Sequence, residues 1–559
     1  MIILVIAALI RYWGISFGLP HTECRPDEAM IIHEAFHAPL IFFHPNSFDY
    51  PSLYKYIVLC LCAFYFIFGL IIGRYTSLID FAQEYAINIQ NFCLISRYFS
   101  AFLGIATILI VYKITKRLFD KKTAIISSFY LSLAYLHVRD SHFGCVDIPQ
   151  TFFIMSSILF ILESYKVKTL KNYIISGMFA GLAASTKYAG ILLIAPMVIV
   201  HGLNNLAKKD KRMQIFFDKR ILFFIAALVF AFLLGTPFSI IDFPKFISDC
   251  LFEIRVLYGE NLGAIFGRGW WHHLSFSLFF GLGWPLLFAS LAGILLLIKT
   301  DLKKTAMLCS FPLIYYFIIG KGYEINVRYA IPVIPFLCIT GSFFTVYVSE
   351  KLTKRIKPQL KNIAIFLMTI FIMAPSAYNS IQFNRLLAKR DNRLIATEWV
   401  YNNIPVGSAI CQIGTFGKLQ LRPTLELLEE QYEKAVVGNG KGKIFRKLRV
   451  DYWKKANLAG YEEWIFDEKT EVFKVGKNEK NTFPKYIIVE RSPLVLYSKV
   501  PLSIEKILSA FYCFRKSFEV INIEERKNLF DQADAFYIPF VGFKDVQRPG
   551  PNIYIYEKR

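Results

Sequence analysis

The sequence carries little charge for its length, which excludes most classes of soluble protein. Charged residues make up 19% of its 559 residues, whereas hydrophobic residues make up 55% and phenylalanine occurs 54 times. Apolar runs recur over roughly the first 380 residues, each near the ~20 residues that a helix needs to cross a bilayer. The composition therefore predicts an α-helical polytopic membrane protein with about 11–13 transmembrane helices.

Several other features are missing. The apolar run from Ile2 to Leu9 has neither a basic segment before it nor a small-residue cleavage site, so we expect an uncleaved first span. The ten cysteines lack the CxxC spacing of metal sites. Cys411 and Cys513 in the polar tail are expected to be single buried thiols, with a disulfide between them as the alternative. No repeat or low-complexity tract occurs.

The net charge of +22 does not indicate nucleic-acid binding, because the Lys and Arg residues fall largely in short loops between apolar runs. If these loops are cytoplasmic, five regions lie on the outer face: Arg139–Pro149, the turn at Thr186-Lys187, Ile240–His272, Lys321–Tyr329, and everything after about residue 380. The basic loops are Lys113–Lys122, Lys166–Lys171, Lys208–Arg220, Lys299–Lys304 and Lys351–Lys361.

The start of the chain fits this assignment of membrane sides less well. If Asp27 is outside and Lys113 is inside, only one net crossing lies between them, yet both Tyr54–Ile72 and Phe92–Tyr112 are apolar enough to cross. We expect Tyr54–Ile72 to be a re-entrant or interfacial element, and the alternative is that the assignment of sides fails there.

The composition changes after the last apolar run. We predict two domains, a transmembrane catalytic domain at 1–380 and an extracytoplasmic soluble α/β domain at 381–559. A helix is expected around Asn392–Tyr401, and four strands are expected at Ala409–Gln412, Tyr486–Val489, Phe518–Ile523 and Ile553–Tyr556.

Two acidic positions are candidates for chemistry. Asp27 and Glu28 follow Pro26 in the first turn of an expected helix from Pro26 to Phe36, where the helix dipole favours their charged forms. Asp147 precedes Pro149 and an apolar run. The simpler interpretation of each is a helix cap, and Asp140 is expected to pair with Arg139.

Basic residues on the expected outer face need an anionic partner, and a lipid phosphate is the natural one at that depth. The alternative is that they anchor helix ends by snorkelling, which suits Lys187 least because apolar sequence surrounds it. These residues are Arg97, Arg139, Lys187, Arg268, Lys321 and Arg328.

Several motifs together resemble the GT-C glycosyltransferases, in their protein O-mannosyltransferase and aminoarabinose-transferase-like branch (family 39-like). The motifs are, in order, RPDEAMIIHEAF, FDYPSLYKY, RDSHFGCVDIPQTFF, STKYAG, NVRYAIPVIPFL and ATEWVYNNIPVGSAI. The resemblance implies a multi-pass enzyme of the cell inner membrane and cell envelope. It would transfer a sugar from a polyprenyl-phosphate donor to a protein, lipid or glycan acceptor on the outer face.

The resemblance also implies roles for individual residues. Asp27 would be the catalytic base, Glu28 would orient it, and Asp147 would line the same cavity. One base and a single displacement imply inversion at the sugar carbon. The donor phosphate would be held by Lys187, Arg268, Arg328, Arg139, Tyr50 and Lys55.

Alternatives to this function remain open. His33 and His37 are one helical turn apart and could bind a zinc ion, but the resemblance implies no cofactor and no catalytic metal. A transporter or lipid flippase also keeps charges within spans. A membrane scaffold whose tail binds partners is the third possibility.

Overall fold

The computed structural model describes residues 1–205, 218–259, 267–353, 358–438, 440, 442–476, 478–523 and 528–559. Two of the predicted basic loops, Lys208–Arg220 and Lys351–Lys361, fall partly outside these residues. The chain forms two compact units. The first comprises Met1–Trp13, His44–Val58 and Ser96–Phe383, and the second comprises Gly14–Phe43, Leu59–Ile95 and Asn384–Arg559. The division at residue 380 stays a prediction, because the second unit also takes in two segments from the start of the chain.

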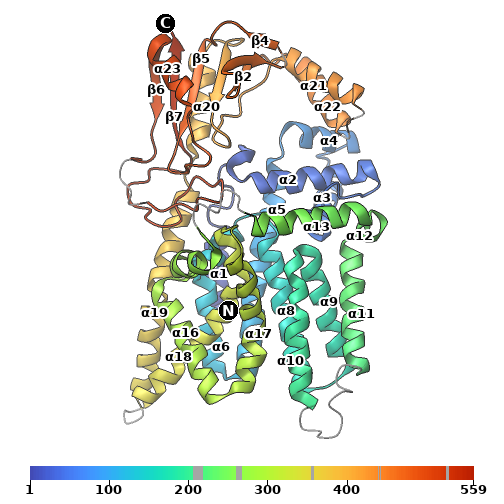
Figure 1. Ribbon diagram of the computed structural model, residues 1–559, viewed down its shortest axis with the longest axis vertical. Helices are drawn as coiled ribbons and strands as arrows, with labels where there is room; N and C mark the ends of the chain where they lie inside the picture. Colours follow the sequence, from blue (N-terminus) through green and yellow to red (C-terminus); the bar gives the residue numbers. More distant parts are fainter. Residues whose placement is uncertain are drawn as a thin grey trace. The chain divides into compact units, whose positions relative to one another are not determined.

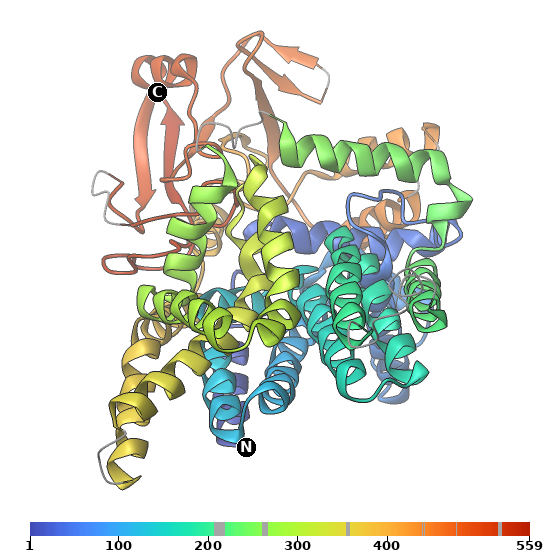
Figure 2. The same ribbon diagram turned by 60° about the horizontal axis from the view of Figure 1, so that its bottom comes forward.

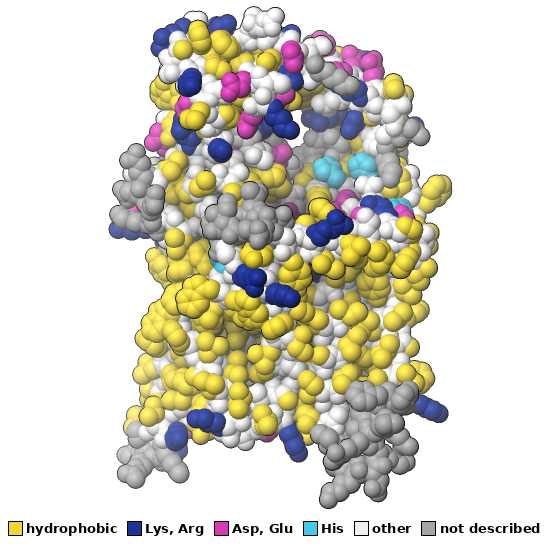
Figure 3. Space-filling model, in the orientation of Figure 1, with side chains coloured by type: hydrophobic (Ala, Val, Ile, Leu, Met, Phe, Trp, Pro, Cys, Tyr) yellow, Lys and Arg dark blue, Asp and Glu magenta, His cyan; other side chains and the backbone are white. Residues whose placement is uncertain are grey.

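The first unit is helical, and hydrophobic side chains cover much of the surface of its long helices (Figure 1, Figure 3). It contains α1 (Ile2–Tyr12), most of α5 (Gln90–Leu118), α6 (Lys121–Leu133), α7 (Tyr135–Ser141), α8 (Asp147–Lys166), α9 (Leu170–Thr186), α10 (Ile194–Asn205), α11 (Lys219–Gly235), α12 (Phe238–Ile241), α13 (Phe243–Tyr258), α14 (Gly269–His272), α15 (Phe279–Leu282), α16 (Trp284–Thr300), α17 (Leu302–Lys321), α18 (Ile334–Leu352) and most of α19 (Pro358–Leu387).

Six helices within the described residues are long and apolar enough to cross a membrane, or seven if the bent pair Gly269–Leu282 and Trp284–Thr300 is one span. This count supports a multi-pass membrane protein but is below the predicted 11–13. The difference arises because several apolar helices are short: α9 and α11 have 17 residues each, and α1 has 11.

The segment expected to be re-entrant or interfacial forms one continuous helix. It is α3 (Leu53–Ile71), whose 19 residues are among those long and apolar enough to cross a membrane. A re-entrant break is therefore absent from this helix, and its interfacial placement stays a prediction.

Small residues set the spacing between two of these helices. A Cβ atom on Gly177 would lie 2.3 Å from the carbonyl oxygen of Phe224, and one on Gly181 would lie 2.2 Å from that of Leu228. Because the two glycines are one turn apart on α9, they form a smooth face on which the backbone of α11 rests.

The second unit carries a seven-stranded mixed sheet in the order β4-β3-β2-β1-β5-β7-β6 (Figure 2). Strand β1 pairs in parallel with β2 and β5, and the remaining pairs are antiparallel. The strands are β1 (Ala409–Ile413), β2 (Glu462–Asp467), β3 (Val472–Val475), β4 (Asn478–Lys480), β5 (Tyr486–Arg491), β6 (Tyr512–Phe518) and β7 (Asn552–Lys558).

Alternate residues of the central strands pack on opposite faces of this sheet. Ile410 and Ile488 join a core with helix α20 (Asn392–Asn403), whereas Cys411 and Ile487 join a core with helix α23 (Leu502–Phe511). This period of two is typical of strands buried on both faces. Helices α2 (Pro26–His37), α4 (Leu78–Ile87), α21 (Leu425–Val437) and α22 (Lys443–Lys455) complete the unit.

The predicted tail elements are mostly confirmed. The helix at Asn392 and the strands at Ala409, Tyr486 and Ile553 all form. The strand expected at Phe518–Ile523 is wrong, because β6 ends at Phe518 and the chain then leaves the sheet. All ten cysteines are free. Cys411 is a single buried thiol as expected, whereas Cys513 is exposed, so its expected burial is wrong.

Candidate active site

The acidic pair Asp27-Glu28 lies in the first turn of α2, with Pro26 at the helix start as the sequence predicts. Glu28 is buried, whereas the side chain of Asp27 is 30% exposed. Arg25 precedes the helix and directs its guanidinium to Asp534 at 2.5 Å, with Asp27 further away at 3.9 Å. The partly exposed carboxylate of Asp27 is thus held beside a cation and at the positive end of a helix dipole.

Asp147 is not a side-chain cap, although it occupies the first turn of α8. The cap position is Val146, which makes no side-chain hydrogen bond, and the Asp147 carboxylate instead accepts a hydrogen bond of 2.8 Å from Nζ of Lys187. Both side chains are largely buried, at 5% and 18% exposed. A buried ion pair of this kind fixes both charges in place.

Lys187 lies where α9 gives way to the 3-10 turn η3 (Tyr188–Leu193), and the chain there is extended. Its ammonium also lies 4.4 Å from the centre of the Tyr329 ring, which adds a cation–π contact. Tyr329 follows Arg328 in the turn η7 (Val327–Val333). The first unit therefore brings together three predicted site positions, Asp147, Lys187 and the segment of Arg328.

Three hydrogen bonds hold the loop that carries Tyr50, and one of them comes from Lys55 in the first turn of α3. The Phe48 backbone donates to Asp249 at 2.9 Å and accepts from the hydroxyl of Tyr188 at 2.6 Å. Nζ of Lys55 donates to the Ser47 carbonyl at 2.8 Å. Asp249 belongs to α13, an amphipathic helix that runs across the direction of α8, α9 and α11 (Figure 1, Figure 2).

An acidic group that sequence reasoning missed surrounds Glu253 on α13. Burial is the largest cause that raises the pKa of Glu253, the charges of Asp49, Glu324 and Asp249 add to it, and Lys187 lowers it, so that the resulting pKa is about 7. A half-buried carboxyl that titrates near neutral pH is suited to proton transfer. No short motif marks this position, and only the amphipathic pattern of its helix could have drawn attention to it.

Other predicted phosphate ligands are placed differently. Arg139 forms the expected ion pair with Asp140, at 3.0 Å and with both side chains buried. Arg268 is partly exposed, and its guanidinium lies over the ring of Tyr323. Arg328 is buried, with 9% of its surface exposed, and its charge lowers the pKa of Glu324, which burial raises overall.

The histidines of the first predicted loop make hydrogen bonds. Nδ1 of His33 lies 2.6 Å from the Tyr85 hydroxyl, and Nδ1 of His37 lies 2.6 Å from the His33 carbonyl. In the parts of the chain that the structure describes, no three His, Cys, Asp or Glu residues are grouped so as to hold a metal ion.

Asp27 and Glu28 belong to the second unit, and Asp147 and Lys187 to the first. The structure describes the surroundings of each pair separately. Their joint participation in one site, which the resemblance implies, stays a prediction.

Comparisons with known proteins agree with this picture. Residues 81–240 match the family model of dolichyl-phosphate-mannose-protein mannosyltransferases. An uncharacterized protein of Aquifex aeolicus (strain VF5) is 23% identical over 290 residues, which are 50% of this chain. The match spans about half of that relative's length, 53%.

Among solved structures, the chain is similar to the oligosaccharyltransferase AglB of Archaeoglobus fulgidus, in complex with an inhibitory peptide and a dolichol-phosphate. The TM-score is 0.50 at 12% identity, over 100% of this chain and 88% of AglB. ArnT of Cupriavidus metallidurans bound to undecaprenyl phosphate gives a TM-score of 0.48 at 13% identity, over 74% of this chain and 82% of ArnT. The chain therefore shares the fold of AglB, and its residues 81–240 match the mannosyltransferase family, both of which agree with the predicted resemblance to the GT-C glycosyltransferases.

Proposed function

Because the chain has a GT-C fold and its residues 81–240 match a mannosyltransferase family, we propose that it is a membrane glycosyltransferase. It takes a sugar from a polyprenyl-phosphate-linked donor and transfers it to a protein, lipid or glycan acceptor on the outer face of the membrane. The dolichol-phosphate in the similar AglB complex supports a lipid phosphate as the carrier.

The observation that carries this proposal is the placement of Lys187. A lysine ammonium has three N–H donors, and the hydrogen bond to Asp147 uses one of them. Its partial exposure leaves the ammonium open to a further anionic partner. A donor phosphate that leaves the sugar gains negative charge on its oxygen, and a fixed cation stabilises that charge.

Asp27 supplies the base in this mechanism. It takes the proton of the acceptor hydroxyl or amine while that group attacks the anomeric carbon, and the lipid phosphate leaves with the bonding electrons. One displacement inverts the configuration at the sugar carbon. The roles need one base and one or more cations and no metal ion, so we expect transfer to continue in the presence of EDTA.

The decisive experiment is a deletion strain that is complemented with variants and compared by mass spectrometry of surface glycans, glycolipids and glycoproteins. We expect the deletion to remove a sugar from one product, and Asp27→Asn to leave it missing although the protein is expressed normally. Glu398→Gln changes an exposed acid of α20 and should restore the product. Normal product with Asp27→Asn would refute the base, and movement of a labelled lipid across the membrane without a new glycosidic bond would favour a flippase.

A further inference from the structure

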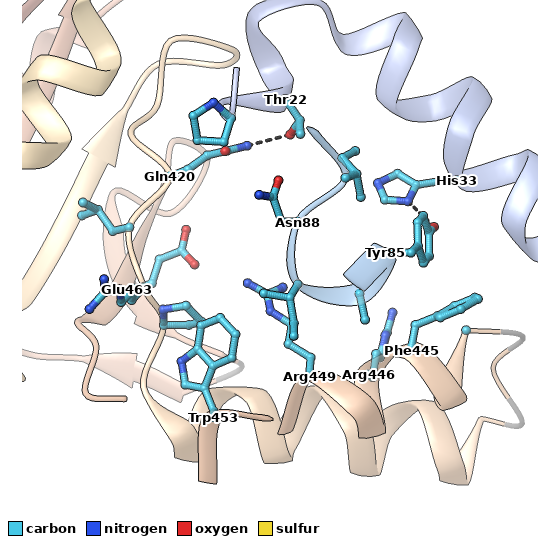
Figure 4. A pocket seen from close by; sticks show the side chains of 18 of the residues that line it. Thr22, His33, Tyr85, Asn88, Gln420, Phe445, Arg446, Arg449, Trp453 and Glu463 are labelled. Atoms are coloured by element: carbon cyan, nitrogen blue, oxygen red, sulfur yellow. Dashed lines mark hydrogen bonds between the residues drawn. The ribbon is translucent and has the colours of Figure 1, made fainter. Parts of the chain in front are cut away.

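A cavity of about 1010 Å³ lies wholly within the second unit, and none of the predicted catalytic or phosphate-binding residues line it, although His33 and His37 do. Its walls come from α2, from the end of α4 and the residues that follow it, from the chain between β1 and α21, and from α22 (Figure 4). The volume is at the upper end of the roughly 300–1,000 Å³ typical of small-molecule sites, which leaves room for a short oligosaccharide.

The charged side chains of this cavity are mostly basic. Four of its lining residues are Lys or Arg, and Glu463 is the single acid among them. Figure 4 shows Arg446 and Arg449 reaching from α22 into the hollow. Among the described residues neither arginine forms an ion pair: Arg446 donates to the carbonyl of Gln431 at 2.8 Å, and Arg449 lies 5.2 Å from the ring of Trp453. The cavity therefore holds positive charge that its own walls do not neutralise.

Burial makes this charge costly. The pKa of Arg449 is lowered because its guanidinium is partly removed from water and no carboxylate compensates it. An anion in the cavity would offset that cost. Arginine is also the residue best suited to bind a carboxylate or phosphate with two parallel hydrogen bonds.

Trp453 contributes aromatic surface to this basic cavity. The residue is 7% exposed and lines the cavity, whereas its indole Nε1 is buried and has no hydrogen-bond acceptor among the described residues. The part of Trp453 that meets the cavity is therefore the apolar part of the ring, on which the apolar face of a sugar can pack.

The rest of the lining suits a sugar. Tyr85, Phe445 and Trp453 give aromatic surface, on which the apolar faces of a sugar ring pack, and the amide of Asn88 can bind hydroxyl groups (Figure 4). We propose that this cavity binds a saccharide that carries a carboxylate or phosphate group, with the anionic group at Arg446 and Arg449 and the sugar ring against the aromatic surface of Trp453. This binding goes beyond the proposed transfer reaction and does not depend on it.

Calorimetric titration of the full-length protein in nanodiscs tests the proposal. The probes are trigalacturonic acid, glucose 1-phosphate, neutral maltotriose and inorganic phosphate. We expect at least one acidic sugar to bind at least tenfold more tightly than maltotriose and than inorganic phosphate. The affinity for this sugar should fall as salt is added. The acidic sugar that binds more tightly shows whether the cavity prefers a carboxylate or a phosphate group.

Three variants locate the binding. Arg449→Met should lower the affinity for the acidic sugar by roughly tenfold or more, because it removes a charged hydrogen bond. Trp453→Phe should lower this affinity less, since the aromatic surface remains. Lys447→Met makes the same change of charge at an exposed position on the same helix, outside the cavity lining, and should have no effect.

Three results would overturn the proposal. One is that neither acidic sugar binds to wild-type protein. Another is that maltotriose or inorganic phosphate binds as tightly as the acidic sugar. The last is that Lys447→Met weakens binding as much as Arg449→Met, which would indicate attraction to the general charge of α22.

Discussion

The ion pair between Asp147 and Lys187 allows a structural role of the lysine to be separated from a catalytic one. Lys187→Met keeps most of the side-chain volume but leaves the Asp147 carboxylate, 5% exposed, as a buried charge without its cation. Breaking such a pair costs roughly 3–5 kcal/mol. We expect about 3 kcal/mol here, near the lower limit, because Lys187 is 18% exposed and water can partly replace it.

The double variant Asp147→Asn with Lys187→Met removes both charges. The double variant has no unpaired buried carboxylate, so it should regain most of the stability that Lys187→Met loses. The changes in the free energy of unfolding of the two single variants should therefore differ from additivity by about 1 kcal/mol or more. Sugar transfer should not return with it, since the proposed cation for the donor phosphate is still missing.

The measurements are equilibrium unfolding in mixed micelles and the glycan product of the complemented deletion strain. A matched control is the exposed ion pair between Lys122 and Glu350, whose removal should change stability by less than about 1 kcal/mol. If the double variant regains both stability and product, Lys187 only balances the charge of Asp147, and its role in phosphate binding is refuted.

Three further outcomes are expected. Because the pKa of Glu253 is raised to about 7, its ionisation costs stability as the pH rises from about 4.5 to 7. Glu253→Gln should therefore raise the unfolding midpoint at pH 8 and change it little at pH 4.5, and an equal change at both would contradict the assignment. Arg393→Lys breaks a buried two-point contact with Asp391, 2.9 Å at each oxygen, and should cost about 1.5–3 kcal/mol, measured by hydrogen exchange of α20. Gly181→Ala places a Cβ against the backbone of α11 and should cost about 1–3 kcal/mol in the same unfolding assay, whereas an unchanged midpoint would show that α11 can move away.

Sequence reasoning succeeded where local chemistry determines structure. Pro26 followed by two acids predicts the start of α2, and adjacent Arg139 and Asp140 predict their ion pair. Apolar character predicts which segments form membrane helices, but it does not predict their length. α9, for example, has 17 residues, and six helices among the described residues are 18 residues or longer and apolar enough to cross a membrane.

The sequence did not predict contacts between distant segments. The predicted topology places Asp147 and Lys187 in loops on the same face, but the hydrogen bond between these residues, 40 positions apart, depends on how α8 and α9 pack. Glu253 was missed for a related reason. Its pKa depends on Asp49 and Glu324, which are far from it in the sequence and belong to no common motif.

The cavity of the second unit also depends on contacts that the sequence does not reveal. His33 and Arg449 line one cavity although more than 400 positions separate them. His33 stands in the first motif of the GT-C resemblance, but the roles expected of that motif belong to Asp27 and Glu28. By itself, the segment Lys443–Lys455 is typical of a solvated basic helix, because charge on a helix usually faces water. Folding instead places Arg449 and Trp453 on the cavity lining, where the partly buried guanidinium of Arg449 forms no ion pair among the described residues. A partly buried cation without a protein partner is thus the feature that separates a binding site from a solvated surface, and it becomes visible only once the burial of each side chain is known.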